Sequence, residues 1–179
     1  MKSSFPIIHI IGLPGSGKTT LARKLSRKYR LPVFRIGEYR SRFPASAIGE
    51  LDAWVNLFRD LSRRKWKNCI LETTGLNQRE SFIRSALPFG QVITVKLEAP
   101  KKVLYGRIGK KRQGEQGGEW LFSENYPNKY EFVKKLYKEF ERIPAEIRID
   151  TTRLSPEKVH EAATNQLKQR MILYSKLEG

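Results

Sequence analysis

The amino-acid sequence predicts an α/β fold in which a parallel sheet is flanked by helices. Short apolar runs alternate with longer amphipathic segments along the chain. A glycine-rich loop, GLPGSGKT at residues 12–19, joins the first apolar run to the first amphipathic segment. Parallel strands need a crossover connection, usually a helix, between them. The alternation therefore implies a parallel sheet with helices on its faces.

The apolar runs and the helical periodicity place the elements in order. The first predicted helix illustrates the pattern, because Leu21, Leu25 and Tyr29 recur every four residues. Ser155 and Pro156 suit the N-cap and first turn of the last helix. The predicted strands are residues 5–11, 32–36, 69–73, 91–97 and 146–150. The predicted helices are residues 19–30, 45–65, 78–87, 100–111, 128–143 and 156–173.

Length and composition indicate one domain spanning residues 1–179, since 39% hydrophobic residues in a chain of this size can bury one substantial core. No segment approaches the ~20 apolar residues of a membrane span, so no membrane association is expected. Cys69 is the single cysteine, which excludes an internal disulfide and a Cys-based zinc site. We therefore expect a cytoplasmic protein, in the host cytoplasm if a phage encodes it.

The charge balance is strongly basic: 35 Lys and Arg against 18 Asp and Glu give a formal net charge of +17. Such an excess suggests a polyanionic partner, and we expect nucleic acid, DNA in preference to RNA. The alternative is a basic, well-solvated surface with no such partner. No obligate protein partner is evident from the sequence.

The loop at residues 12–19 has the G-x-x-x-x-G-K-[ST] pattern of a phosphate-binding loop. Its glycines let backbone N–H groups converge on nucleotide phosphates, and Lys18 reaches the β and γ oxygens. The Thr19 hydroxyl is placed to ligate Mg²⁺, and the helix that follows directs its positive end at the same anion. The residues predicted to bind the nucleotide here are Gly12, Gly15, Ser16, Gly17, Lys18, Thr19 and Thr20.

Several segments occur in the order typical of one superfamily. They are GLPGSGKTT, FRIGEYR after the second strand, ILETTGLN at the third, VKLEAPKKVLYGRIGKKR, and RIDTTRLSPEKV. Together they resemble the P-loop kinase superfamily, which includes adenylate, gluconate and polynucleotide kinases. Within it the chain is most similar to the kinase domain of phage polynucleotide kinase, because VKKLYKEF at residues 133–140 resembles a helix of that domain. Phage kinases of hydroxymethylated DNA bases share the superfamily.

The resemblance implies a five-stranded sheet in the order 2-3-1-4-5, with ATP and Mg²⁺ as cofactors. It implies that Glu38 is the general base, although the family's usual Asp falls on Gly37, one position earlier. The alternative for Glu38 is a substrate-orienting or surface residue. Glu72 closes the third strand, where a carboxylate helps to hold Mg²⁺, usually through its waters. Its alternative role is a structural carboxylate.

A basic lid at about residues 107–125 is also implied. Arg107 and Arg112 would offset charge that develops on the transferred phosphoryl group. Arg153 would cover the adenine ring. Four residues are candidates for acceptor binding, or alternatively for solvated loop charge and turn formation: Arg40, Arg42, Thr74 and Asn77.

The expected function is an ATP-dependent kinase, a phosphotransferase with an alcohol group as acceptor. The expected acceptor is a nucleic-acid hydroxyl, either a 5′-OH end or a hydroxymethylated DNA base. The alternative is a kinase of a small molecule, such as a nucleoside, nucleotide or metabolite. A further alternative is a nucleotide-dependent nucleic-acid binder without catalysis.

Overall fold

A five-stranded parallel sheet runs through the centre of the molecule, with its strands in the order β2-β3-β1-β4-β5. This computed structural model describes residues 5–76, 79, 80, 83, 87, 91–110 and 126–177, with side chains up to residue 172. The strands are β1 (Ile7–Gly12), β2 (Val33–Arg35), β3 (Cys69–Thr73), β4 (Val92–Glu98) and β5 (Ile147–Asp150). The predicted fold class and strand order are therefore confirmed.

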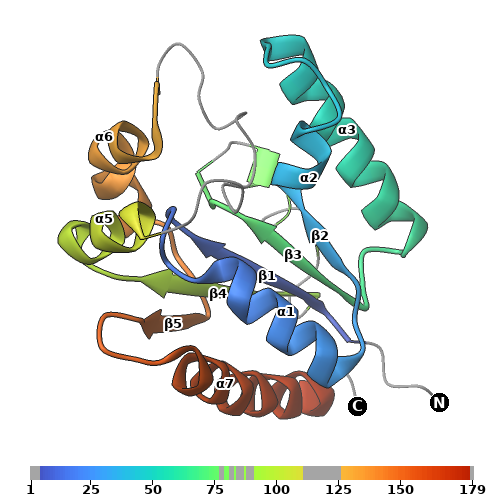
Figure 1. The fold of residues 1–179 in the computed structure, drawn as a ribbon. Helices are drawn as coiled ribbons and strands as arrows, with labels where there is room; N and C mark the ends of the chain where they lie inside the picture. Colours follow the sequence, from blue (N-terminus) through green and yellow to red (C-terminus); the bar gives the residue numbers. More distant parts are fainter. Residues whose placement is uncertain are drawn as a thin grey trace.

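Helices cover both faces of this sheet (Figure 1). Those within the described parts of the chain are α1 (Lys18–Tyr29), α2 (Ile36–Arg40), α3 (Ala47–Arg63), α5 (Lys101–Gly109), α6 (Lys129–Glu141) and α7 (Pro156–Leu177). None of these helices has the length and apolar character that crossing a bilayer requires. Of the predicted helix at 78–87, the structure describes residues 79, 80, 83 and 87, so that prediction lies largely outside the described residues.

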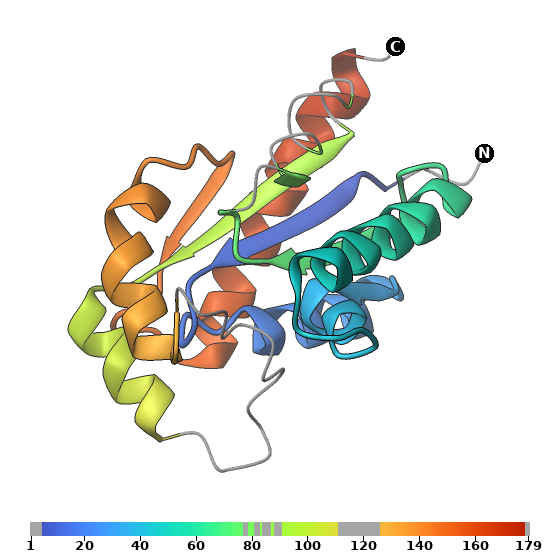
Figure 2. The same cartoon turned by 90° about the horizontal axis from the view of Figure 1, so that it is seen from above.

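The alternation of side chains along β1 explains why both faces carry helices. Ile8 and Ile10 are fully buried on one face, in a cluster with Leu25 of α1 and with residues of α7. Ile7 and Ile11 are fully buried on the opposite face. There Ile7 packs with residues of α2 and α3, whereas Ile11 packs with residues of α5 and α6. In Figure 2, seen from above, α7 passes behind the strands, α3 lies on one side of them, and α5 and α6 lie on the other. A central strand buried on both sides holds the loop that follows it in a fixed position.

The second strand differs from its prediction at its carboxyl end. Ile36, predicted to be in the strand, is instead the first residue of the five-residue helix α2, and both Ile36 and Tyr39 are buried against α3. The Ser46 side chain caps α3 by accepting a hydrogen bond from the Gly49 N–H at 3.1 Å. This cap starts α3 at Ala47, two residues later than predicted. The burial of Ile36 and Tyr39 is tertiary, which is why periodicity alone did not reveal α2.

Candidate active site

The phosphate-binding loop lies between the carboxyl end of β1 and the first turn of α1, as predicted. Two of its glycines have a positive φ, 83° at Gly15 and 96° at Gly17, which favours glycine. A Cβ on Gly12 would lie 2.4 Å from Ser16 Oγ, and one on Gly15 would lie 2.8 Å from the Leu104 carbonyl oxygen. The loop therefore depends on glycine for both its backbone conformation and its close packing.

The interior of the loop fits a phosphate group. Ser16 is 2% exposed, and its Oγ is buried without a hydrogen-bond partner in the described structure. A buried hydroxyl left in this state is costly, so it marks a place where a polar ligand atom is accommodated. The Lys18 ammonium donates to the Leu13 carbonyl at 3.2 Å, across the loop. The loop thus holds a buried hydroxyl and an ammonium group close to its own backbone.

The Thr19 hydroxyl and the Glu72 carboxylate meet beside this loop. Thr19 Oγ1 donates to Glu72 Oε1 at 2.7 Å, and the Glu72 side chain is 9% exposed. The contact arises because Glu72 is paired with Ile10 in the β3–β1 ladder, which brings the ends of both strands to one edge. The described residues hold no group of three or more His, Cys, Asp and Glu side chains that could form a closed metal centre. A hydroxyl and one carboxylate suit Mg²⁺, which keeps several waters and binds through few protein ligands.

Arg35 joins this pair, a contact that sequence reasoning missed. Its Nε donates to Glu72 Oε2 at 3.0 Å, and its Nη1 donates to Glu38 Oε1 at 2.8 Å. Glu38 lies in α2 with its side chain 51% exposed, near the edge of the sheet that carries the phosphate loop. The structure therefore links the predicted base, Glu38, to the predicted metal carboxylate, Glu72, through one guanidinium. In the β2–β3 ladder, Arg35 is paired directly with Glu72. The sequence alone does not show which residues of two strands are paired, so this contact was not predicted.

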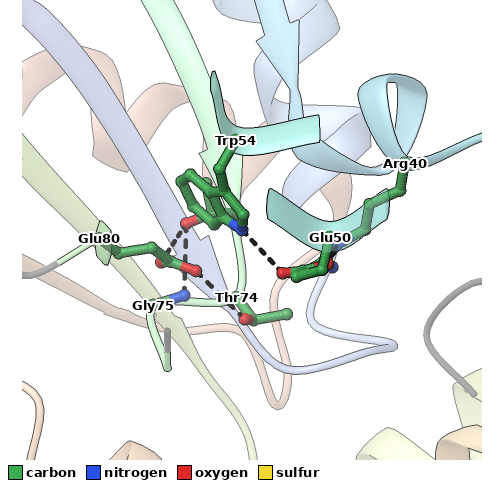
Figure 3. Close-up of polar contacts among 7 residues, drawn as sticks. Arg40, Glu50, Trp54, Thr74, Gly75 and Glu80 are labelled. Carbon is green, nitrogen blue, oxygen red and sulfur yellow. Dashed lines mark hydrogen bonds and ion pairs between the residues drawn. The ribbon is translucent and has the colours of Figure 1, made fainter. Parts of the chain in front are cut away.

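The two arginines predicted to grip an acceptor phosphate are engaged elsewhere. Arg40 binds Glu50 of α3 through two hydrogen bonds, Nε to Oε2 at 2.8 Å and Nη2 to Oε1 at 2.7 Å. Trp54 Nε1 donates to the same Glu50 Oε1 at 2.7 Å (Figure 3). The guanidinium of Arg42 lies over the Tyr39 ring, 4.6 Å from its centroid. The expected phosphate contacts are thus corrected, because Arg40 fastens α2 to α3 and Arg42 stacks on α2.

The charge of Arg40 acts on the titration of Glu50. Burial alone would raise the pKa of the Glu50 carboxyl group. The hydrogen bonds and charge of Arg40, together with the Trp54 hydrogen bond, outweigh burial and lower the pKa of Glu50 below its ordinary value. Glu50 therefore stays ionised under neutral conditions, as a pair with Arg40 requires.

A buried polar group lies just beyond β3. Thr73 Oγ1 donates to Glu80 Oε2 at 2.5 Å, and its oxygen is 2.8 Å from His9 Nε2. Thr74, predicted to position the acceptor, has its hydroxyl 3.5 Å from Glu80 Oε1 (Figure 3). Sequence reasoning missed Glu80, which is fully buried. Asn77, the other predicted acceptor residue, lies outside the described residues.

Arg107 is held by Thr151, beside the phosphate loop. Its Nη1 donates to Thr151 Oγ1 at 2.9 Å, and its Nη2 donates to the Thr151 carbonyl oxygen at 2.5 Å. It lines a cavity of about 210 Å³ together with Thr20, with residues 15–17 of the loop and with Leu154. The guanidinium is thus held on the β5–α7 connection beside the loop, and its role at the transferred phosphoryl group stays a prediction. Arg112 lies outside the described residues.

Of the other predicted nucleotide-binding residues, Thr20 belongs to the lining of this cavity and Arg153 does not. Arg153 is exposed directly before Leu154, which lines the cavity. Its lining combines polar loop residues with the apolar side chains of Leu21, Leu154 and Val159. The cavity therefore joins residues 15–17 of the phosphate loop to Pro156 and Val159 at the start of α7.

Several solved structures with the same fold are named as kinases. A gluconokinase from Sinorhizobium meliloti 1021 superposes with a TM-score of 0.66 at 13% identity, covering 96% of this chain and 97% of that one. A shikimate kinase from Acinetobacter baumannii in complex with shikimate gives 0.65 at 20% identity, covering 97% and 96%. A sugar kinase from Janibacter sp. HTCC2649 gives 0.61 at 19% identity, covering 92% and 95%. None of the curated proteins matches the sequence.

These structures correct the expected partner. They are named as kinases of gluconate, shikimate and sugar, and none of the three is named as acting on nucleic acid. The expectation of a nucleic-acid partner is therefore contradicted, and the engagement of Arg40 and Arg42 agrees with this correction. The comparison supports the P-loop kinase fold and gives no support for a specific likeness to phage polynucleotide kinase.

The sequence itself matches one family model. The match covers residues 8–129, which is more than half of the chain and includes the phosphate loop, Glu38 and Glu72. The model describes an AAA domain. The chain therefore belongs to this AAA-domain family, and its fold is that of the P-loop kinases.

Proposed function

We propose that the protein is a Mg²⁺-dependent kinase that transfers the γ-phosphoryl group of ATP to a hydroxyl group of a small molecule. The observation that carries this proposal is the hydrogen bond between Thr19 and Glu72 beside a loop that holds a buried, unpartnered Ser16 hydroxyl. The family match and the kinase structures with the same fold support it.

The nucleotide side of the proposed site has three parts. The backbone and Ser16 hydroxyl of the loop bind phosphate oxygens, and Lys18 supplies a positive charge beside them. The cavity lined by Arg107, Thr151 and Leu154 receives the base. Thr19 and Glu72 hold Mg²⁺, which when bound neutralises phosphate charge. Lys18 is the residue whose charge matters most as negative charge redistributes during transfer.

The acceptor side is assigned to the ends of β2 and β3. Glu38 lies there, half-exposed to solvent, and it is the proposed base that accepts the proton of the attacking hydroxyl. The Thr74 hydroxyl follows β3 at the same edge and is proposed to orient the acceptor. Because Arg40 and Arg42 are engaged by Glu50 and Tyr39, a compact acceptor fits this region better than an extended polyanion.

The test is ADP formation from ATP and Mg²⁺ in the presence of gluconate, shikimate, hexoses or nucleosides, with the phosphorylated product located by mass spectrometry. At least one acceptor is expected to raise ADP formation well above that with ATP alone. Lys18→Ala should lower the acceptor-dependent rate by about 10²-fold or more while leaving the thermal unfolding midpoint unchanged. The matched control is Lys28→Ala, an exposed lysine of the same helix, which should behave as wild type. Wild-type turnover in Lys18→Ala would refute the proposal.

A further inference from the structure

Arg35 occupies a position between the two halves of the site. It is the last residue of β2, and the parallel ladder pairs it directly with Glu72 of β3. Residues directly opposite each other on two paired strands extend their side chains to the same face of the sheet. The guanidinium of Arg35 therefore meets the carboxylate of Glu72. The side chain of Arg35 is 25% exposed, and that of Glu72 is 9% exposed. A pair this sheltered from water is screened less by salt than a surface ion pair.

The two oxygens of Glu72 have different partners. Oε1 accepts the hydrogen bond of the Thr19 hydroxyl at 2.7 Å, and Oε2 accepts that of Arg35 Nε at 3.0 Å. Arg35 thus binds one oxygen and leaves the other on the side of the phosphate loop. Because Glu72 is largely buried beside a neutral hydroxyl, Arg35 also supplies the charge that compensates the carboxylate.

The second branch of the guanidinium holds Glu38. Arg35 Nη1 donates to Glu38 Oε1 at 2.8 Å, three residues along the chain. Within the described ranges, no other side chain donates a hydrogen bond to the Glu38 carboxylate. A glutamate that is 51% exposed would otherwise sample several rotamers. One planar fork therefore fixes a carboxylate on the metal side and another on the acceptor side.

We infer that Arg35 is a positioning residue that couples the Mg²⁺-binding pair, Thr19 and Glu72, to the acceptor-side carboxylate Glu38. This inference rests on the proposed function, in which Glu38 and Glu72 act on the acceptor and on the metal. The rigid guanidinium serves both carboxylates at once through separate N–H groups. A lysine ammonium, a point charge on a flexible stem, does not reproduce that geometry.

The experiment compares Arg35→Met and Arg35→Lys with wild type in the fastest acceptor reaction found, and in Mg²⁺-dependent ATP hydrolysis without acceptor. We expect Arg35→Met to lower kcat about 10- to 100-fold while the Kd for ATP, measured by calorimetry, changes less than about threefold. Arg35→Lys should recover the folding stability without recovering kcat. Arg148→Met is the matched control, because Arg148 also binds a glutamate across neighbouring strands, and that glutamate is Glu98, which has no proposed role at the metal or the acceptor.

A double-mutant cycle separates positioning from general destabilisation. If Arg35 acts through Glu38, the double variant Arg35→Met with Glu38→Gln should be no slower than the slower single variant within about threefold. Independent, multiplying losses would overturn the inference, as would a wild-type kcat in Arg35→Met. If wild type itself forms no ADP in either reaction, the proposed function fails. Normal wild-type turnover with an unaffected Arg35→Met overturns only the role of Arg35.

Discussion

Substitution of Gly12 by alanine tests the geometry of the phosphate loop directly. The added Cβ would lie 2.4 Å from Ser16 Oγ, 3.1 Å from the Leu97 carbonyl oxygen and 3.2 Å from Lys18 Cγ. Neither of the first two neighbours moves easily, because Ser16 is 2% exposed and the Leu97 carbonyl belongs to the buried strand β4. The loop must therefore change shape to admit one methyl group.

The size of the effect follows from the cost of overpacking. Inserting a methylene-sized group into a well-packed region costs about 1–3 kcal/mol. If the loop recovers its shape only when ATP binds, that energy is lost from binding, and the Kd for ATP rises about 5- to 150-fold because each 1.4 kcal/mol is a factor of ten. If the strain remains in the free protein, the same energy lowers the free energy of unfolding instead.

Calorimetric titration with ATP and Mg²⁺, together with urea unfolding, measures both quantities. Gly106→Ala is the matched control, since a Cβ there meets nothing within 4 Å in helix α5. That control should leave ATP binding unchanged and raise stability by about 0.5–1 kcal/mol. Wild-type ATP affinity and wild-type stability together in Gly12→Ala would refute the argument that the cradle excludes a side chain at this position.

Three further predictions concern the Glu50–Arg40 pair, the burial of Cys69 and the hydrogen bonds of Lys96. Glu50→Gln should destabilise the fold by about 1.5–3 kcal/mol at pH 7, because Arg40 loses its charged acceptor. Because the pKa of Glu50 is lower in the folded state, the ionised carboxylate stabilises the fold above its unfolded-state pKa, and this stabilisation is lost as the pH falls through the folded-state pKa. The thermal unfolding midpoints of wild type and Glu50→Gln should therefore converge as the pH is lowered. A difference that stays constant with pH would contradict the pairing of Glu50 with Arg40. Burial raises the pKa of the Cys69 thiol to about 12. A chromogenic disulfide reagent at pH 8 should therefore react with Cys69 only as fast as the protein unfolds. Immediate reaction in the folded protein would contradict the burial of this thiol. Lys96→Met removes the donor to two backbone carbonyls and should lower the free energy of unfolding by about 1–3 kcal/mol in urea, whereas the exposed Lys138→Met should have no effect.

The phosphate loop and the sheet were predictable because their signals are local. Eight consecutive residues define the loop, and the alternation of strands and helices is visible in windows of about ten residues. The strand order followed from the resemblance to P-loop kinases, and the structure confirms it. Boundaries moved by one to four residues where tertiary packing decided them, as at Ile36, which is helical because it is buried against α3.

The partners of individual charged residues were not predictable from the sequence. The basic composition suggested a nucleic-acid partner, but a sum of charges does not show which arginines are already paired. Arg40 is bound by Glu50, ten residues away, and Arg107 is bound by Thr151, 44 residues away. Each of these partnerships depends on how helices and strand ends pack, so neither appears in a local pattern.

The sequence by itself determined the nucleotide-binding loop, the alternating α/β pattern, and the candidacy of Thr19, Glu38 and Glu72. Only the tertiary structure decided that Thr19 contacts Glu72 and that Arg35 joins Glu72 to Glu38. The physical reason is the register of the parallel ladders, which sets Glu72 beside Ile10 on one side and beside Arg35 on the other. Strands that are 37 or more residues apart in the chain meet through hydrogen bonds and buried side chains, and that pairing converts separate residues into one site.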